Sequence, residues 1–433
     1  MNFAEVRSIV NERAIRAPYP AKLRGIMSME RAREIRAWLL EWSELARGPT
    51  PLVSLPDLAS RLGVAEISVK DESVRSPLGS FKALGAPCAL VQLIQRLHSH
   101  RVMSPEDLLR GRLRTGLGEF TVISATDGNH GRCLAAAASS IGCNCVIVLH
   151  ANVSREREDA IMLHHARIVR IEGNYDQSVE EAARLAAGMD WQVVSDTSYE
   201  GYEEVPRDVM QGYGIIAAEV LESTGSKPGE RGRFTHVFIQ GGVGGLAAGL
   251  GSYLWEFHGA NRPGIVIIEP MQADCLFQSA RLGRPARATG TVDSVMAGLA
   301  CGEASALAWR FLQPLVDGFA VVPDHLAVHA MQLLARGSRR DMPLISGESG
   351  AAGLAGLIAL LDDEAAARRT GLDGDSRILL INTEGATAPG VYEHLVGERV
   401  ESVCVRQADW VQSARAAARY EACKPERDSS SSR

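Results

Sequence analysis

The feature that most restricts the fold of this sequence is a repeated alternation of short apolar segments and longer helical patterns. The expected strands are residues 66–70, 121–125, 145–149, 167–171, 192–195, 234–240, 265–269, 319–322 and 377–382. The expected helices include residues 80–97, 130–141, 155–165, 178–187, 207–223, 246–255, 326–335 and 350–361. Repeated strand–helix–strand units require mostly parallel sheets with helices on both faces. In such folds, ligands bind beyond the carboxyl ends of the strands.

The length and net charge of the chain restrict the classes of ligand that it can bind. A chain of 433 residues exceeds what one hydrophobic core organises, so we expect more than one domain. The net charge is −6, from 46 basic and 52 acidic residues, which provides no basic field for a nucleic-acid backbone. The most apolar long stretch, residues 237–255, is interrupted by glycines and Gln240, which favours a buried strand, loop and helix over a membrane span. We therefore expect a small-molecule ligand, and neither nucleic acid nor membrane as a partner.

The two ends and the cysteines carry weaker signals. Glu5 and Arg7 lie where a secretory signal would need an unbroken apolar run, so we expect a cytoplasmic protein. The 8 cysteines are scattered without a CxxC pair, which fits a reducing compartment, and no metal site is expected. Residues 1–50 are expected to form helices that cover the main domain or meet a partner subunit. Residues 99–119 are expected to form an exposed connection, and the serine-rich tail from Arg427 to be disordered.

A glycine-rich loop follows the strand expected at residues 234–240. It consists of Gly241, Gly242, Val243, Gly244 and Gly245. Backbone N–H groups at a helix N-terminus bind phosphate, and a missing Cβ lets the phosphate oxygens approach them. No Gly-Lys-Ser/Thr follows, and the loop comes late in the chain for a dinucleotide motif. The loop indicates a phosphate site of mononucleotide size, although a glycine cluster alone also fits a simple tight turn.

Lys82 is a second candidate, at the start of the helix expected at residues 80–97. An arbitrary lysine is a solvated surface residue, but Phe81, Ala83 and Leu84 beside this one are apolar. A desolvated lysine loses its proton more easily, as a lysine that forms a Schiff base must. We therefore expect a lowered pKa and a covalent role for Lys82.

A third candidate is the loop SATDGNHG, residues 124–131, between an expected strand and an expected helix. Its small residues, Asn129 and two glycines can surround a planar ring and offer N–H groups to a carboxylate. Asp127 in this loop can equally be a helix N-cap. His130, taken alone, is also compatible with a structural hydrogen bond.

Together and in this order, the three segments resemble the fold-type II pyridoxal-phosphate enzymes, the tryptophan synthase β/threonine dehydratase superfamily. The resemblance covers about residues 45–400. It implies an α/β fold with two open, mostly parallel twisted sheets covered by helices, and pyridoxal 5'-phosphate between a large and a small domain. Residues 1–94 and 188–405 would form the large domain, residues 95–187 the small domain, and residues 406–433 a C-terminal extension.

The resemblance also implies roles for single residues. Lys82 would bind the cofactor covalently, and Asn129 would contact its phenolic oxygen. The loop 241–245 would hold the phosphate, and Thr383 would place a neutral hydroxyl at the pyridine nitrogen. The substrate would contact Thr126, Asp127, Gly128 and His130.

Further segments resemble the diaminopropionate ammonia-lyase family. They are DTSYEGY at residues 196–202, MQGY at 210–213, MAGLACGE at 296–303 and SGESG at 346–350. That family uses two aspartates, whose motif positions are Asp127 and Asp196 here, although Asp196 alone could be a polar residue that caps a turn. The implied reaction is α,β-elimination of 2,3-diaminopropionate to pyruvate and two ammonia. Asp127 would act on the D isomer and Asp196 on the L isomer, each as a desolvated base of raised pKa.

Two other interpretations remain open. A serine/threonine dehydratase-like or β-replacement enzyme of the same fold would carry the same three segments and act on another β-substituted alanine. A non-catalytic phosphate-binding protein would need only the loop 241–245. The resemblance further implies a homodimer that acts on a small amino-acid substrate.

Overall fold

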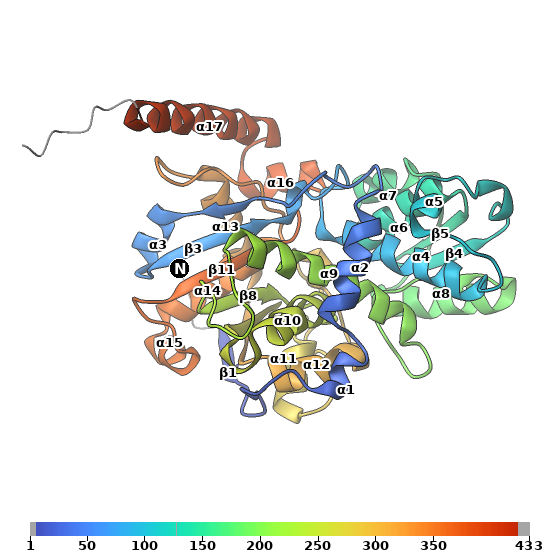
Figure 1. Cartoon of the computed structure of the whole chain (residues 1–433), viewed down its shortest axis with the longest axis horizontal. Helices are drawn as coiled ribbons and strands as arrows, with labels where there is room; N and C mark the ends of the chain where they lie inside the picture. The colour runs from blue at the N-terminus through green and yellow to red at the C-terminus, as the bar shows by residue number, and fades with distance from the viewer. Residues whose placement is uncertain (1–5, 127, 423–433) are drawn as a thin grey trace, which may run out of the picture.

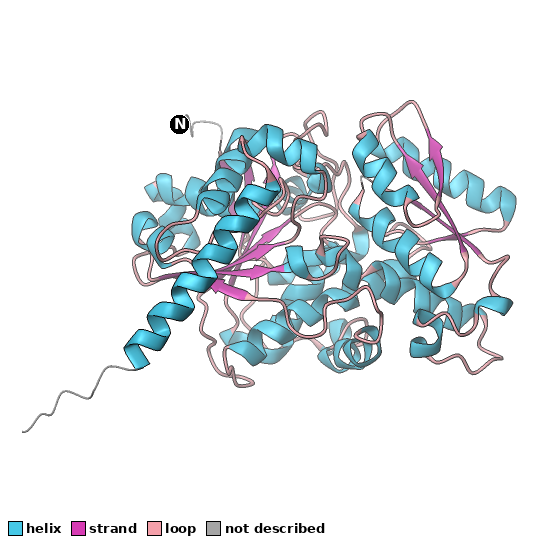
Figure 2. Cartoon of the chain, turned by 90° about the horizontal axis from the view of Figure 1, so that it is seen from above, coloured by secondary structure: helices cyan, strands magenta, loops and turns pink. Residues whose placement is uncertain are grey.

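The computed structural model describes residues 6–126 and 128–422. In this part of the chain the strands form two separate sheets, each covered by helices (Figure 1). The two sheets lie in different halves of the molecule (Figure 2). The structure therefore has the α/β architecture that the alternating pattern predicts.

The larger sheet has seven strands in the described residues. They are β1 (Arg7–Val10), β2 (Leu52–Ser54), β3 (Glu66–Asp71), β8 (His236–Gln240), β9 (Gly264–Pro270), β10 (Gly318–Val322) and β11 (Arg377–Asn382). Their order is β1-β10-β9-β8-β11-β3-β2, in which only β1 and β2, at the two edges, pair antiparallel. The inner strands are mostly apolar because helices cover both faces, although β3 also buries Ser68, Lys70 and Asp71.

The smaller sheet has four parallel strands in the described residues, in the order β6-β5-β4-β7. They are β4 (Thr121–Ala125), β5 (Asn144–Leu149), β6 (Arg167–Arg170) and β7 (Gln192–Val193). The strands of this sheet come from residues 121–193, close to the segment 95–187 that we propose as the small domain.

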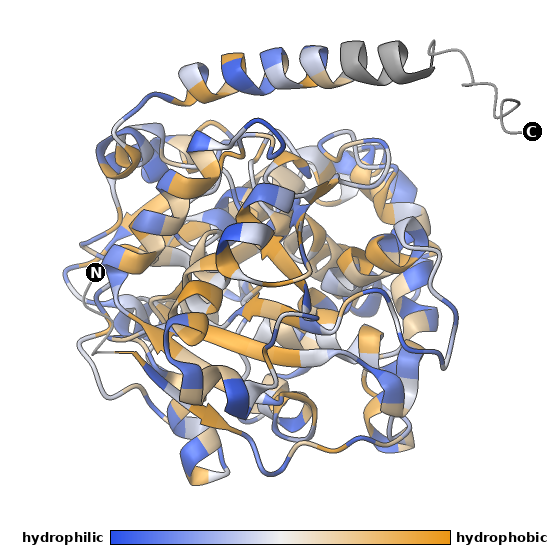
Figure 3. Ribbon diagram, turned by 90° about the vertical axis from the view of Figure 1, so that its left-hand side faces the viewer, coloured by the Kyte–Doolittle hydropathy of each residue, from blue (hydrophilic) through white to orange (hydrophobic). Residues whose placement is uncertain are grey.

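Helices surround both sheets. They are α1 (Ala21–Arg24), α2 (Met29–Leu39), α3 (Pro56–Leu62), α4 (Ala86–Leu97), α5 (Pro105–Leu109), α6 (Asn129–Ile141), α7 (Arg155–Met162), α8 (Tyr175–Met189), α9 (Glu204–Ser223), α10 (Gly245–His258), α11 (Cys275–Leu282), α12 (Ala306–Leu315), α13 (Asp324–Arg336), α14 (Ala352–Asp362), α15 (Glu364–Thr370), α16 (Pro389–Val396) and α17 (Val400–Ala422). Apolar residues gather on the strands and inner helix faces, and polar residues on the outer faces (Figure 3). No helix of the described ranges has both the length and the apolar character that a bilayer span requires.

The nine strands expected from the sequence are all present, each with bounds within about two residues of the expected ones. The helix expected at residues 80–97 is broken at Gly85 into the short 3-10 turn η2 (Phe81–Leu84) and α4. Pro87, in the first turn of α4, has no N–H to continue the hydrogen bonds from the preceding turn, and a Cβ on Gly85 would lie 2.7 Å from the ring of Tyr213.

Three expectations about the less patterned segments were incomplete or wrong. Residues 1–50 contain the strand β1 as well as helices. The segment 99–119 is not simply exposed, because it forms α5 and buries Leu108 and Leu109 in the core. The C-terminal extension expected at residues 406–433 is helical in its described part, since α17 continues to Ala422. The tail from Arg427 lies outside the described residues.

Candidate active site

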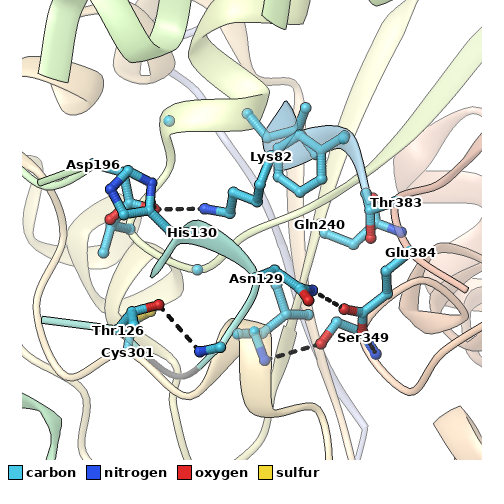
Figure 4. Close-up of a pocket in the computed structure, with 18 of the residues that line it drawn as sticks. Lys82, Thr126, Asn129, His130, Asp196, Gln240, Cys301, Ser349, Thr383 and Glu384 are labelled. Carbon is cyan, nitrogen blue, oxygen red and sulfur yellow. Dashed lines mark hydrogen bonds and ion pairs between the residues drawn. The ribbon is translucent and has the colours of Figure 1, made fainter. Parts of the chain in front are cut away.

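A cavity lies where the carboxyl ends of strands from both sheets meet, and it brings together nearly all of the predicted site residues (Figure 4). The predicted residues that line it are Lys82, Thr126, Gly128, Asn129, His130, Asp196, Gly241, Gly242, Val243, Gly245 and Thr383. Gly244 belongs to the same loop but is packed behind the cavity wall, against Leu312. Asp127 lies outside the described residues, between two neighbours that both line the cavity.

Lys82 and Asp196 form an ion pair at the centre of the cavity. The distance from Lys82 Nζ to Asp196 Oδ2 is 2.5 Å, and the two side chains are 18% and 13% exposed. Burial opposes the charge of Lys82, but the facing carboxylate raises the pKa of Lys82 above its ordinary value. Burial alone would raise the pKa of Asp196, but Lys82 and His130 lower it to about 2. The expected shifts, a lowered pKa for Lys82 and a raised one for Asp196, are therefore wrong for the cofactor-free protein, because the sequence did not show that the two groups face each other.

His130 is buried beside this pair. Its Nε2 lies 2.9 Å from the carbonyl oxygen of Val194, and its Nδ1 lies 4.0 Å from Asp196 Oδ2. Burial lowers the pKa of His130, although Asp196 acts in the opposite direction. A neutral ring must then donate Nε2–H to Val194, which leaves the Nδ1 lone pair towards the cavity.

The glycine-rich loop joins β8 to α10, whose first N–H groups have no partner within the helix. Gly242 and Gly244 have φ values of +61° and +99°, in the region that favours glycine. At Gly241 and Gly244 an added Cβ would meet Glu269 at 2.5 Å and Leu312 at 2.7 Å. Glycine is thus required here by backbone conformation and by packing behind the loop, in addition to the close phosphate approach that the sequence suggested.

Asn129 and Thr383 come from opposite halves of the molecule. Asn129 is the first residue of α6, and its Nδ2 donates to the carboxylate of Glu384. Thr383 directly follows β11, and its carbonyl oxygen accepts a 3.0 Å hydrogen bond from the N–H of Phe81. This bond holds the end of β11 against the turn that carries Lys82.

Several lining residues were not assigned a role from the sequence. They are Arg157, Tyr175, Tyr213, Gln240, Cys301, Ser349 and Glu384. Gln240 ends the apolar strand β8 immediately before the glycine-rich loop, and a polar residue at that point was a usable signal. Glu384 belongs to the segment that contains Thr383. Tyr213, Cys301 and Ser349 lie in the segments 210–213, 296–303 and 346–350, so the family resemblance of those segments was a usable signal. Arg157 and Tyr175 reach the cavity through packing between distant segments.

Gln240 has an unsatisfied polar atom in the wall of the cavity. Its Nε2 donates to the carbonyl oxygens of Gly350 at 2.8 Å and Ile381 at 2.7 Å, whereas its Oε1 is buried without a partner among the described residues. The hydroxyl of Tyr213 is also buried, beside Lys82. A buried polar atom without a hydrogen bond costs about 1–3 kcal/mol, so Gln240 Oε1 favours a polar ligand.

The cavity fits a phosphorylated aromatic aldehyde. The N-terminus of α10 suits its phosphate, Lys82 suits its carbonyl carbon, and the polar atoms of Asn129, Gln240 and Thr383 suit the ring substituents and ring nitrogen. Residues 43–384 match the family model of the pyridoxal-phosphate dependent enzymes. The chain belongs to this family.

Comparison with individual proteins narrows the relationship. The diaminopropionate ammonia-lyase of Escherichia coli strain K12 is 37% identical over 363 residues, which cover 82% of this chain and 89% of that enzyme. The crystal structure of its holo form has a TM-score of 0.81 at 34% identity and covers 90% and 96% of the two chains. A probable D-serine dehydratase of Pseudomonas aeruginosa is more distant, with 25% identity over 292 residues, or 63% of each chain.

Proposed function

We propose that this chain is a pyridoxal-phosphate-dependent ammonia-lyase that converts 2,3-diaminopropionate into pyruvate and two molecules of ammonia. The observation that carries this proposal is the Lys82–Asp196 pair, 2.5 Å apart within a cavity that also contains the glycine-rich loop. It places a carboxylate beside the lysine that would bind the cofactor, and a carboxylate attracts the second ammonium group of a diamino acid. The similarity to the E. coli ammonia-lyase supports the same substrate.

The bound cofactor supplies an electron-withdrawing ring that accepts the charge left when the substrate loses its Cα proton. The loop 241–245 would hold its phosphate, Asn129 its phenolic oxygen, and Thr383 its ring nitrogen. A neutral hydroxyl at that nitrogen, instead of a carboxylate, favours elimination over transamination. Lys82 provides the covalent attachment.

The base would be an aspartate. We propose that Asp127 removes the Cα proton of the D isomer and that Asp196 removes that of the L isomer. Asp196 is a weak base while Lys82 is charged, with a pKa of about 2. With the cofactor bound, the nitrogen of Lys82 would share its charge with the phenolic oxygen, so its attraction for Asp196 would weaken and the basicity of Asp196 would rise.

The loop after β4 would bind the substrate. In the described part of this loop, Thr126 Oγ1 accepts hydrogen bonds from the N–H groups of Gly128 at 3.1 Å and Gly131 at 3.2 Å. We propose that Thr126, Asp127, Gly128 and His130 contact the substrate. The β-amino group leaves as ammonia from its protonated form, and the released aminoacrylate hydrolyses to pyruvate and the second ammonia.

A pyruvate-release assay tests the function on D- and L-2,3-diaminopropionate and on serine, with and without added pyridoxal phosphate. We expect turnover of a diaminopropionate isomer well above that of serine, and dependence on the cofactor. We expect Asp127→Asn to lower turnover of the D isomer, and Asp196→Asn that of the L isomer, by about 100-fold or more. A wild-type protein that ignores both isomers but acts on serine would instead be a dehydratase.

We also propose that the chain acts as a homodimer in the cytoplasm. Both statements rest on the family resemblance and, for the compartment, on the scattered cysteines. Light scattering of the purified holoenzyme should give twice the chain mass of 46.6 kDa. Cell fractionation with an antibody against the chain checks the compartment.

A further inference from the structure

Glu384 is a buried carboxylate in the cavity wall, and the proposed chemistry gives it no role. It follows Thr383 at the end of β11 and is 3% exposed. Its Oε2 accepts a hydrogen bond from Asn129 Nδ2, and its Oε1 accepts one from the backbone N–H of Ser349 at 3.0 Å (Figure 4). Both carboxylate oxygens are therefore used as acceptors.

The hydrogen bond between Asn129 and Glu384 crosses the cavity. Asn129 begins α6, which packs on the smaller sheet, whereas Glu384 follows a strand of the larger sheet. The bond thus joins one half of the molecule to the other at the point where the cofactor would lie.

The segment 346–350 is shaped around Glu384. A Cβ on Gly347 would lie 2.9 Å from Glu384 Cγ, and a Cβ on Gly350 would lie 2.8 Å from the carbonyl oxygen of Glu384. The two glycines let the segment approach closely enough for the N–H of Ser349 to reach the carboxylate. The position of Glu384 is therefore fixed from the larger-sheet side, independently of Asn129.

A carboxylate can only accept hydrogen bonds, so it selects the amide nitrogen of Asn129 over the amide oxygen. That nitrogen carries two hydrogens, and the bond to Glu384 uses one. We propose that Glu384 is a positioning residue that orients Asn129 so that its second N–H meets the phenolic oxygen of bound pyridoxal phosphate. This role rests on the proposed contact of Asn129 with the cofactor and extends it to a residue that does not itself react.

The test uses an exchange of donor and acceptor. In Glu384→Gln the new amide accepts from Ser349 and presents an N–H to Asn129, so Asn129 either faces it donor to donor or turns its amide oxygen towards it and takes its own N–H away from the cofactor. The double variant Asn129→Asp/Glu384→Gln restores both bonds, because the new amide donates to the new carboxylate while its oxygen accepts from Ser349. The double variant has no N–H at position 129 for the cofactor. Glu398→Gln, in an ion pair with Arg406 away from the cavity, is the matched control.

Three quantities are measured for each variant: the melting temperature without cofactor, the affinity for pyridoxal phosphate by fluorescence titration, and the pH midpoint of the absorbance change of the bound cofactor. A donor to the phenolic oxygen stabilises its anionic form, so losing the donor should raise this midpoint. We expect Glu384→Gln to bind the cofactor about tenfold more weakly, with the midpoint about one pH unit higher. The control should match the wild type.

The double variant is decisive. We expect it to regain the wild-type melting temperature while its cofactor affinity and absorbance midpoint stay altered. Wild-type affinity and midpoint in Glu384→Gln, or their recovery in the double variant, would overturn the proposal. If Glu384→Gln does not fold, Glu384→Asp, which withdraws the carboxylate from Asn129 without adding a donor, is measured in its place. A wild type that binds the cofactor but releases no pyruvate would overturn the proposed function and leave this test intact.

Discussion

Asp196 and Lys82 stabilise each other in the cofactor-free protein, because each would otherwise be a buried charge without a partner. The same arrangement of the two side chains also places the proposed base next to the lysine that would bind the cofactor. Once Lys82 is covalently engaged by the cofactor, the carboxylate of Asp196 would become available to the substrate's ammonium or to its Cα proton. The resting ion pair thus holds the proposed base in place until the cofactor arrives.

A stability measurement follows from the pKa of Asp196. The folded-state pKa of about 2 lies below the ordinary value of 3.8, so this group contributes stability above about pH 4 that is lost as the pH falls towards 2. We expect Asp196→Asn to lower the free energy of unfolding of the cofactor-free protein by about 2 kcal/mol at pH 7. We would measure urea unfolding of both proteins at pH values from about 7 to about 2.5. The difference between their free energies of unfolding should become smaller at the acid end of this range. Equal free energies of unfolding of Asp196→Asn and the wild type at pH 7 would contradict this prediction.

Lys82 gives a second prediction at the residue scale. We expect Lys82→Ala to lose the visible absorbance of the covalently bound cofactor and all detectable pyruvate release. Absorbance spectra after desalting, with Lys22→Ala in the exposed helix α1 as control, check this outcome. A colourless wild type that cannot be loaded with pyridoxal phosphate would contradict the assignment of Lys82 itself.

Among the elements, α9 stands out because it packs its backbone directly against its neighbours. A Cβ on Gly212 would lie 2.2 Å from the carbonyl oxygen of Leu84, at the end of the turn that carries Lys82. On the other side, a Cβ on Gly249 of α10 would lie 2.1 Å from the carbonyl oxygen of Met210. The lysine turn, α9 and the phosphate-loop helix therefore form one closely packed stack.

A matched pair of glycine substitutions tests this stack. We expect Gly212→Ala to destabilise the protein by about 1–3 kcal/mol, because a backbone carbonyl must move to admit the methyl group. Gly188→Ala, in the exposed part of α8 with nothing near its Cβ, should instead stabilise it by about 0.5–1 kcal/mol. Urea unfolding should show changes of opposite sign in the free energy of unfolding of the two variants. An unchanged free energy of unfolding in Gly212→Ala would show that α9 is not packed tightly against the lysine turn.

The elements were predictable to the extent that burial made them apolar. The nine expected strands are inner strands or belong to the parallel ladders, so their sequences read as continuous apolar runs. The edge strands β1 and β2 have only 4 and 3 residues and lack such runs. The break at Gly85 has a local signal in Pro87, in the first turn of α4, whereas the close contact of Gly85 with the ring of Tyr213 could not be predicted.

At the scale of the whole molecule, polar contacts across the cavity connect its two halves. Arg157 of α7 forms an ion pair with Glu348, near the bond between Asn129 and Glu384. Burial, together with repulsion from Glu384, raises the pKa of Glu348 to about 7. The charge on this side of the cavity therefore changes near neutral pH.

A prediction at this scale concerns Glu348. A carboxyl whose folded-state pKa is raised stabilises the protein at low pH, and that contribution is lost as the pH rises through about 7. We expect Glu348→Gln to gain stability relative to the wild type between pH 5 and pH 8, on the order of 2–3 kcal/mol. Urea unfolding of both cofactor-free proteins over this range measures it. A difference that does not vary with pH would mean that Glu348 keeps one charge state throughout.

The site was predictable where its residues cluster in short motifs at strand ends, as at Lys82, Asn129 and the loop 241–245. It was not predictable where a role arises from two segments meeting in space. Glu384 lies 255 residues from the asparagine that it contacts. Likewise, no local pattern shows that Arg157 of α7 reaches the cavity.

The position of the cavity between two sheets has a consequence for the life of the protein in the cell. A ligand that contacts both halves binds only when they are assembled, so its binding free energy adds to the stability of the folded chain. At a free cofactor concentration 100 times its dissociation constant, this addition is about 2.7 kcal/mol. The supply of the cofactor would then determine what fraction of the protein molecules escapes proteolysis, in addition to determining their activity.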